Sequence, residues 1–246
     1  MATLETHRTR KVSRWRWLTV GAGAFLVLVS ALVAVWWALS RETRTTTYEV
    51  RGQLEAITLD LGSADATVVG AGGRSSVGVR YVDRFAFDRP AETSRSVRDG
   101  ELHIRSRCPD AMLSPCTTGF RVTVPDNVPL TVLTSSGSVR FDGFRGSARV
   151  QTGSGDVSIE RYCGFALSAR ADTGDVSAGA ACAFERLELR SRTGDVRALV
   201  PAGRYRVDAD TDTGVRRLRG VTAVDDSPFQ VLAISDTGDV TVEATP

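Results

Sequence analysis

The sequence predicts an all-β protein: a parallel β-solenoid with coils of about 18–20 residues, preceded by one N-terminal transmembrane helix. Two observations predict the solenoid. A short phrase centred on Gly-Asp recurs at a nearly constant spacing, and the residues before each copy alternate between small or apolar and polar side chains. An N-terminal run of 23 residues without an ionisable side chain predicts the helix. The 246 residues are 42% hydrophobic and 24% charged, a composition that excludes disorder throughout the chain.

The uncharged run at residues 17–39 would extend about 34 Å as an α-helix, at roughly 1.5 Å per residue, which is enough to cross a bilayer. Trp15 and Trp17 lie at one end of the run and Trp36 and Trp37 at the other, where indole rings favour the membrane interface. Five basic residues precede the run within nine positions, and two follow it closely. The positive-inside rule therefore predicts a cytoplasmic N-terminus and an extracytoplasmic C-terminal domain.

These features predict a single-pass protein of the cell membrane, whose partner along residues 17–39 is the lipid bilayer. We expect four parts: a basic cytoplasmic tail at 1–16, a signal-anchor helix at 17–39, a polar tether at 40–49 and an extracytoplasmic β-repeat domain at 50–246. A cleaved signal peptide is the alternative, since Ala38 and Ser40 are small residues at a suitable spacing before Arg41. The run is longer than the roughly 7 to 15 apolar residues of a signal core, which favours the anchor. In either case the repeat domain is exported.

The repeated phrase is Ser/Thr-Gly-Asp-Val, found at 154–157, 173–176, 193–196 and 237–240, with variants at 136–139 and 213–215. Its glycines are separated by 18, 19, 20, 20 and 24 residues. Glycine suits a tight corner because it accepts a positive φ, and Asp can hydrogen-bond to nearby backbone amides. We therefore predict structural turns at Gly137, Gly155, Asp156, Gly174, Asp175, Gly194, Asp195, Gly214, Gly238 and Asp239.

The residues around each turn predict two half-buried strands. Two, four and six positions before the Ser/Thr the side chains are small or apolar, as at Ala171, Ala169 and Leu167, and the intervening positions are mostly polar. An earlier copy without the glycine begins at Ile57. One such unit cannot bury its own inner face, so successive units are expected to stack as parallel rungs about 4.8 Å apart. A β-sandwich is the alternative, because Gly-Asp also suits hairpin turns.

The turn series between 136 and 239 and two longer phrases carry a resemblance to a known family. The phrases are FRVTVPDNVPLTVLTSSGSV at 120–139 and LVPAGRYRVDADTDTG at 199–214. Over about residues 50–244 the chain resembles the bacterial putative-adhesin domain of unknown function, a family of β-strand repeats commonly preceded by one membrane span. The resemblance implies a surface-exposed domain and brings no catalytic residues. The chain departs from the family pattern at Val215, where Asp is expected, and in the last spacing, so we expect irregular stacking near 215–228.

All four cysteines lie in the predicted exported domain, where disulfides persist. Cys108 and Cys116 enclose a short loop, and Cys163 and Cys182 hold nearly the same place in consecutive coils. Stacked rungs would bring the Cα atoms of the second pair to about 5 Å, inside the window that a disulfide needs. We predict bonds between Cys108 and Cys116 and between Cys163 and Cys182, out of three pairings that four cysteines allow.

Metal binding is not expected. A zinc site would need C-x2-C spacing or several histidines, and His103 is the only histidine of the exported domain. Calcium at the column of turn aspartates is the competing hypothesis, but calcium takes six to eight oxygens and each coil supplies one carboxylate, so we expect these aspartates to cap turns. A second acidic group lies on an outward strand face with arginines nearby: Asp208, Asp210 and Asp212, with Arg204 and Arg206.

The charge distribution disfavours nucleic acid as a partner. Residues 1–44 carry seven basic and two acidic side chains, and the rest of the chain carries 24 basic and 27 acidic ones, whereas phosphate binding needs clustered positive charge. We expect no cofactor and no small-molecule substrate. The expected function is non-catalytic surface binding or adhesion, with a cell-wall or other surface partner. The alternatives are an accessory in envelope-stress signalling and, disfavoured, a polysaccharide-acting β-helix enzyme, which would need two acids at a defined separation.

Overall fold

The fold was analysed in a computed structural model, which describes residues 14–109 and 116–245. The chain divides into two compact units, residues 1–41 and 42–246, and each is described by itself. Most of the expected basic tail, residues 1–13, lies outside the described residues.

The first unit contains helix α1 (Arg14–Leu39), whose described side chains at residues 22–38 are all exposed. They include Phe25, Leu26 and Trp36, each more than 60% exposed. Across the described residues, however, no helix combines the length and the apolar character that a bilayer crossing requires. The structure therefore does not support the transmembrane helix that the sequence predicts at 17–39.

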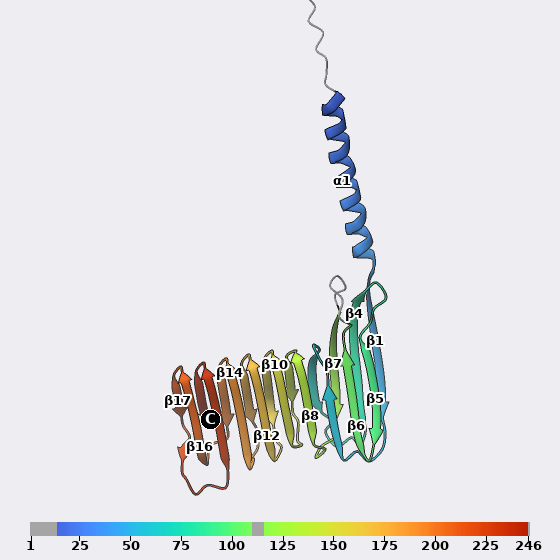
Figure 1. The fold of residues 1–246 in the computed structure, drawn as a ribbon. Helices are drawn as coiled ribbons and strands as arrows, with labels where there is room; N and C mark the ends of the chain where they lie inside the picture. Colours follow the sequence, from blue (N-terminus) through green and yellow to red (C-terminus); the bar gives the residue numbers. More distant parts are fainter. Residues whose placement is uncertain (1–13, 110–115, 246) are drawn as a thin grey trace, which may run out of the picture. The chain divides into compact units, whose positions relative to one another are not determined.

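The second unit is built from two ten-stranded sheets, and the strand arrows of both run side by side in Figure 1. The first sheet has the order β1 (Arg41–Val50), β4 (Val77–Ala86), β7 (Thr117–Val124), β3 (Asp65–Gly70), β9 (Val139–Asp142), β11 (Val157–Tyr162), β13 (Val176–Ala180), β15 (Val196–Val200), β20 (Val240–Ala244) and β17 (Arg216–Arg219). The second has the order β18 (Thr222–Ala223), β16 (Arg204–Thr213), β19 (Gln230–Thr237), β14 (Arg186–Thr193), β12 (Ala166–Thr173), β10 (Ala148–Ser154), β8 (Leu130–Ser136), β2 (Ala56–Asp60), β6 (Glu101–Arg107) and β5 (Glu92–Arg98).

Each coil contributes one strand to each sheet, and equivalent residues of neighbouring coils lie in register. Val150 of β10 pairs with Ala169 of β12, which pairs with Leu189 of β14, and all three strands are parallel. A meander of hairpins would pair neighbouring strands antiparallel. The parallel stack therefore confirms an all-β solenoid-like repeat and not the β-sandwich alternative.

The stacking order departs from the sequence order at the C-terminal end. The coil of β19 and β20, which we call the inserted coil (230–244), lies between the coil of β14 and β15 and the cap coil (204–219) formed by β16 and β17. The chain reaches the end of the stack at β17, and residues 220–229 lead it back to the gap. This return explains the long last spacing. Residues 230–244 are regularly paired on both sides, so the irregularity lies in the return segment 220–229, of which only β18 (Thr222–Ala223) pairs with a strand, at the edge of β16.

The N-terminal end shows a second exchange of order. Strand β2 pairs with both β6 and β8, so the first copy of the repeat lies inside the stack and the coil of β6 and β7 lies beyond it. Strands β4 and β5 then add antiparallel to β7 and β6. The polar tether that the sequence predicts at 40–49 largely coincides with β1, which forms the edge strand next to β4.

The core lies between the two sheets and consists of the inward columns. One column contains Val139, Val157, Val176, Val196 and Val240, each 1% exposed or less. Because each valine lies over the same residue of the next coil, the apolar surface is continuous along the stack. The last position of this column is Arg216 in the cap coil, which is exposed and ends the column in a charged group.

Candidate functional site

The turn glycines form a column in which each backbone lies against the next. A Cβ placed on Gly174 would lie 2.4 Å from the carbonyl oxygen of Gly155, and one on Gly194 would lie 2.2 Å from that of Gly174. The column continues out of sequence order, from Gly194 to Gly238 and from Gly238 to Gly214. The φ angles at these turns lie between +132° and +157° for all but Gly137. Only glycine satisfies both the close approach and the positive φ.

The turn aspartates form a ladder of hydrogen bonds beside the glycines. The N–H of Asp175 donates to Oδ1 of Asp156 at 3.0 Å, and the N–H of Asp195 donates to Oδ1 of Asp175 at 2.8 Å. The ladder continues to Asp239 and ends where the N–H of Val215 donates to Oδ1 of Asp239 at 2.9 Å. Each carboxylate therefore connects its own turn to the turn of the neighbouring coil, which is a structural role.

Position 215 needs no carboxylate. Val215 lies in the cap coil, and no further coil follows whose backbone N–H a carboxylate at this position could accept. Arg217 donates to Asp239 at 2.6 Å, and this bond, together with the Val215 N–H, lowers the pKa of the Asp239 carboxyl from its ordinary value of 3.8. The departure from the repeat pattern at Val215 thus marks the end of the ladder.

A column of buried hydroxyl groups reaches the same turns from inside. Ser191 donates to the carbonyl of Gly174 at 2.8 Å, and Ser235 donates to that of Gly194 at 2.8 Å. Thr152 donates to the carbonyl of Gly137 at 3.2 Å. Ala171 takes this place in its own coil, paired in register with Thr152 and Ser191, and has no hydroxyl to donate.

Both predicted disulfides are present. Cys108 and Cys116 are joined with their Cα atoms 5.7 Å apart, and most of the loop between them lies outside the described residues. Cys163 and Cys182 are joined with their Cα atoms 4.8 Å apart. The second bond covalently links two stacked coils at equivalent positions.

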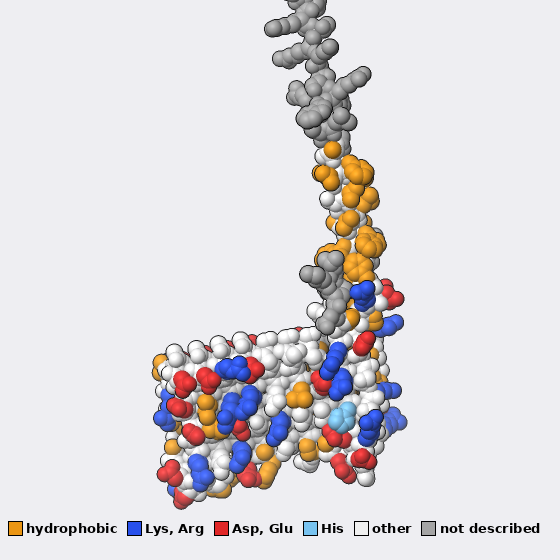
Figure 2. Space-filling view, in the orientation of Figure 1, with side chains coloured by type: hydrophobic (Ala, Val, Ile, Leu, Met, Phe, Trp, Pro, Cys, Tyr) orange, Lys and Arg blue, Asp and Glu red, His pale blue; other side chains and the backbone are white. Residues whose placement is uncertain are grey.

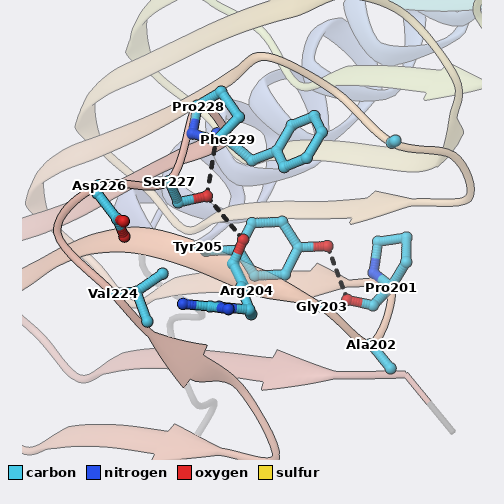
Figure 3. A pocket seen from close by; sticks show the side chains of 11 residues that line it. Pro201, Ala202, Gly203, Arg204, Tyr205, Val224, Asp226, Ser227, Pro228 and Phe229 are labelled. Atoms are coloured by element: carbon cyan, nitrogen blue, oxygen red, sulfur yellow. Dashed lines mark hydrogen bonds between the residues drawn. The ribbon is translucent and has the colours of Figure 1, made fainter.

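A concave site lies at the cap coil, where residues 220–229 return to the stack. Its cavity of about 480 Å³ is lined mainly by apolar groups, with Tyr205 and Phe229 as the aromatic residues. The Tyr205 ring stacks on Phe184 at 5.6 Å between centroids and meets Phe229 edge-on at 6.4 Å. We call this site the cap pocket, and Figure 3 shows the residues that line it: Ala183, Pro201, Ala202, Gly203, Arg204, Tyr205, Val224, Asp226, Ser227, Pro228 and Phe229.

Hydrogen bonds fix the walls of the cap pocket. The Tyr205 hydroxyl donates to the Pro201 carbonyl at 2.7 Å, and the Ser227 hydroxyl donates to the Arg204 carbonyl at 2.8 Å (Figure 3). Burial raises the pKa of the Tyr205 phenol, so the ring stays neutral at physiological pH. Asp226 is the only carboxylate among the lining residues.

The outward face of the second sheet is polar and carries both signs of charge, as Figure 2 shows for the face on which β8 to β16 lie. Arg192 pairs with Asp172 at 2.9 Å across neighbouring coils. Arg206, predicted to be a counter-charge for the outward aspartates of β16, instead donates from Nε to the Asp225 carbonyl. Within the described parts of the chain, no group of three or more His, Cys, Asp or Glu side chains is arranged to hold a metal ion.

A family model matches residues 122–244, which is half of the chain and contains all six turn glycines. The chain belongs to the Toastrack DUF4097 family. The predicted resemblance to a putative-adhesin domain of unknown function is thereby confirmed. No curated protein matches the chain.

The chain is also similar to solved structures. A putative cell adhesion protein from Clostridium sporogenes matches with a TM-score of 0.51 at 12% identity, over 83% of this chain and 100% of its own. A putative adhesin from Bacteroides fragilis matches with a TM-score of 0.45 at 11% identity, over 83% of this chain and 97% of its own. At 12% identity, the similarity to the Clostridium sporogenes protein is evidence for the fold and not for a function.

Sequence reasoning placed the turn residues of the Toastrack domain but missed the cap pocket. Tyr205 and Phe229 are 24 residues apart and become neighbours only because the inserted coil returns beside the cap coil. One signal was available: the longest spacing between turns contains two aspartates, a proline and an aromatic residue at 225–229, which is unusual for a coil.

Proposed function

We propose that this Toastrack protein is an adhesin-like surface-binding module that acts without catalysis, and that the cap pocket receives part of its ligand. The observation that carries the proposal is the lining of the pocket: two aromatic rings in apolar surroundings with a single carboxylate, Asp226. Ligand sites are typically concave and mostly apolar, with a few polar groups that fix orientation. Hydrolysis of a glycosidic bond generally requires two carboxyl groups across the scissile bond, and this lining supplies one.

The chemistry of the walls favours a ligand that presents a flat apolar face and polar edges. Phe229 is 39% exposed and lines the cavity with its aromatic ring, while Arg204 and Asp226 supply charged groups. The Tyr205 hydroxyl is engaged with Pro201 and is protonated, so it is not a free base. A surface role is also supported by the name of the Clostridium sporogenes protein of the same fold, a putative cell adhesion protein. Cell-wall glycans, which present rings and hydroxyls, are the proposed partner.

The proposal is tested by co-sedimentation of the full chain, in detergent micelles, with insoluble bacterial cell-wall fragments. We expect Phe229→Ala to weaken binding about tenfold, because aromatic contacts contribute on the order of 1 kcal/mol beyond buried area. The control is Phe165→Ala, which removes an exposed ring that does not line the pocket. Equal loss in both variants would contradict the assignment of the pocket. Release of soluble sugars from the fragments would contradict the non-catalytic role.

We also propose that the chain is held at a membrane by residues 17–39, with its N-terminus cytoplasmic. The support is the uncharged sequence of this run and the exposure of the apolar side chains of α1, among them Leu28, Leu32 and Val33. Extraction of cell membranes with alkaline carbonate tests the proposal, since an anchored chain stays in the pellet. Replacing Leu28 and Leu32 with Arg should release the chain, because each charge costs about 3 kcal/mol at the centre of a bilayer. Release of the unaltered chain would overturn the anchor.

A further inference from the structure

Four arginines that form no ion pair with any described acidic residue lie on the outward face of the first sheet, on strands β4, β7 and β9. Arg80 and Arg84 belong to β4, Arg121 to β7 and Arg140 to β9, and all four side chains are exposed. We call this group the arginine patch. It lies outside the cap pocket and includes none of the turn residues.

The register of the strands brings these like charges together. Arg80 is the direct cross-strand partner of Arg121 in the antiparallel pair of β4 and β7. Thr67 of β3 lies between Arg121 and Arg140 and pairs in register with both. Like charges directly opposite each other destabilise a sheet, so this arrangement costs stability unless an anion is bound.

Some outward arginines of the domain have acidic partners on neighbouring strands. Arg105 pairs with Asp60 at 3.0 Å, and Arg197 of β15 pairs with Glu243 of β20 at 3.3 Å. Within the described residues, none of the four arginines of the patch has an acidic group within 4.0 Å. The four guanidinium groups therefore have no ion pair within the described residues that would compete with a bound anion.

A recess in the sheet surface adjoins the patch. It has a volume of about 310 Å³, and its lining includes Arg80, Arg84 and Arg121. Gly119 leaves the recess open, since a Cβ there would meet no atom within 4 Å. Asp65 is the one acidic residue of the lining, and its Oδ1 already accepts the backbone N–H of Ser138.

We propose that the arginine patch binds an extended polyanion that carries several phosphate-type oxyanions. Arg121 and Arg140 are two strand spacings apart, about 10 Å, and Arg80 and Arg84 are four residues apart along one strand, about 13 Å. One oxyanion cannot reach all four guanidinium groups, whereas a chain of oxyanions can. The planar guanidinium group of an arginine can bind a phosphate-type oxyanion with two parallel hydrogen bonds. This inference rests on the proposed surface-binding role and names an anionic polymer as a second partner, at a site separate from the cap pocket.

The test measures binding of fluorescently labelled inorganic polyphosphate to the full chain in detergent micelles. The double variant Arg80→Gln/Arg121→Gln should weaken binding about tenfold or more, because two charged hydrogen-bond donors are lost. The matched control is Arg197→Gln, which removes one positive charge from the same sheet but from a paired arginine. We expect the control to change the affinity by less than about twofold.

Thermal unfolding gives a second readout that does not depend on the label. Polyphosphate should raise the Tm of the unaltered chain and leave that of the double variant unchanged. Without polyphosphate, the double variant should unfold at the same temperature or higher, because a like-charge pair has been removed. A lower Tm in the variant would overturn the argument from unpaired charge.

Three further outcomes would overturn the proposal. Polyphosphate could fail to bind, or Arg197→Gln could weaken binding as much as the double variant. Inorganic phosphate could also compete as well as unlabelled polyphosphate at the same total concentration of phosphate groups. Binding to phosphatidylglycerol vesicles without binding to polyphosphate would also overturn it in favour of a lipid surface. Phe229→Ala should leave polyphosphate binding unchanged. Failure of the arginine patch is thereby distinguished from failure of the cap pocket.

Discussion

At the scale of single residues, the turn of each coil is held from two sides. The carboxylate of one turn accepts a backbone N–H of the next, as in Asp175 and Asp195, and a buried hydroxyl donates to a turn carbonyl, as in Ser191 and Gly174. Both contacts depend on the close approach that glycine permits. The turn glycines and the capping role of the aspartates could be predicted from the sequence. Which backbone N–H donates to each carboxylate could be identified only from the stacked coils.

Gly174→Ala should destabilise the protein by about 3 kcal/mol. The new Cβ would lie 2.4 Å from the Gly155 carbonyl oxygen, and alanine is strained at a φ of +132°. The measurement is urea unfolding followed by circular dichroism. Gly179→Ala is the matched control in the same coil, since its Cβ would meet only the Ile159 carbonyl oxygen at 3.8 Å and should change stability by less than about 1 kcal/mol. Similar effects at the two glycines would contradict the role of the column.

Asp175→Ala should cost about 1 kcal/mol of stability, because the N–H of Asp195 loses its acceptor. Asp175→Asn should cost much less, since the amide oxygen can still accept. Addition of calcium should leave the melting temperature of either variant and of the unaltered chain unchanged. A calcium-dependent rise that Asp175→Asn abolishes would instead support an ion-bound ladder.

At the scale of elements, a strand in this fold is defined by alternation and a turn by glycine, and both are visible in the sequence. The strands from β8 to β15 follow the predicted period closely. Prediction was poorer for residues 41–50, which form β1, because a strand rich in Thr, Arg and Glu at a sheet edge lacks inward apolar residues in its first half. Residues 41–50 form a strand because they pair with β4, and this contact is distant in the sequence.

The cap coil should be sensitive to acid through Asp239. Because Arg217 and the Val215 N–H lower the pKa of Asp239, the folded state favours the charged carboxylate. The stabilisation is fully present above the ordinary value of 3.8 and is lost as the pH falls through the lowered pKa of the folded state. In a carboxyl NMR titration, Arg217→Ala should raise the midpoint of Asp239 towards 3.8. Arg219→Ala, on the same strand but without a bond to Asp239, is the control, and an unchanged midpoint in Arg217→Ala would refute the assignment.

At the scale of the whole domain, the order of coils in space differs from the order in sequence at both ends. The inserted coil lies between the coil of β14 and β15 and the cap coil. The cap coil, which contains Arg216 and the exposed Val215, is therefore the last coil of the stack. Solenoids need end coils with polar outer surfaces, and this exchange places a polar coil at the end. The cap pocket is a consequence of the same exchange, because it is formed where the chain returns.

Paired cysteines can test the exchange. Ile234 pairs in register with both Arg190 and Asp210, so Arg190 and Asp210 are two strands apart. Under mild oxidation, Arg190→Cys with Ile234→Cys should form a disulfide, with Cα atoms about 5 Å apart, whereas Arg190→Cys with Asp210→Cys should not, at about 10 Å. Non-reducing electrophoresis after proteolysis at an intervening site reads out the bond. The reverse result would mean that the coils stack in sequence order.

The sequence by itself determined the repeat, the inward columns, the turn chemistry and both cysteine pairs. These properties follow from local periodicity, which acts within one coil or between equivalent positions of adjacent coils. The tertiary structure alone decided which coil lies next to which at the two ends, and hence where the cap pocket and the arginine patch are found. The physical reason is that every coil offers nearly the same apolar face and the same open strand edges. Local sequence therefore permits several stacking orders, and only the long-range fit of the end coils and the return loop selects one.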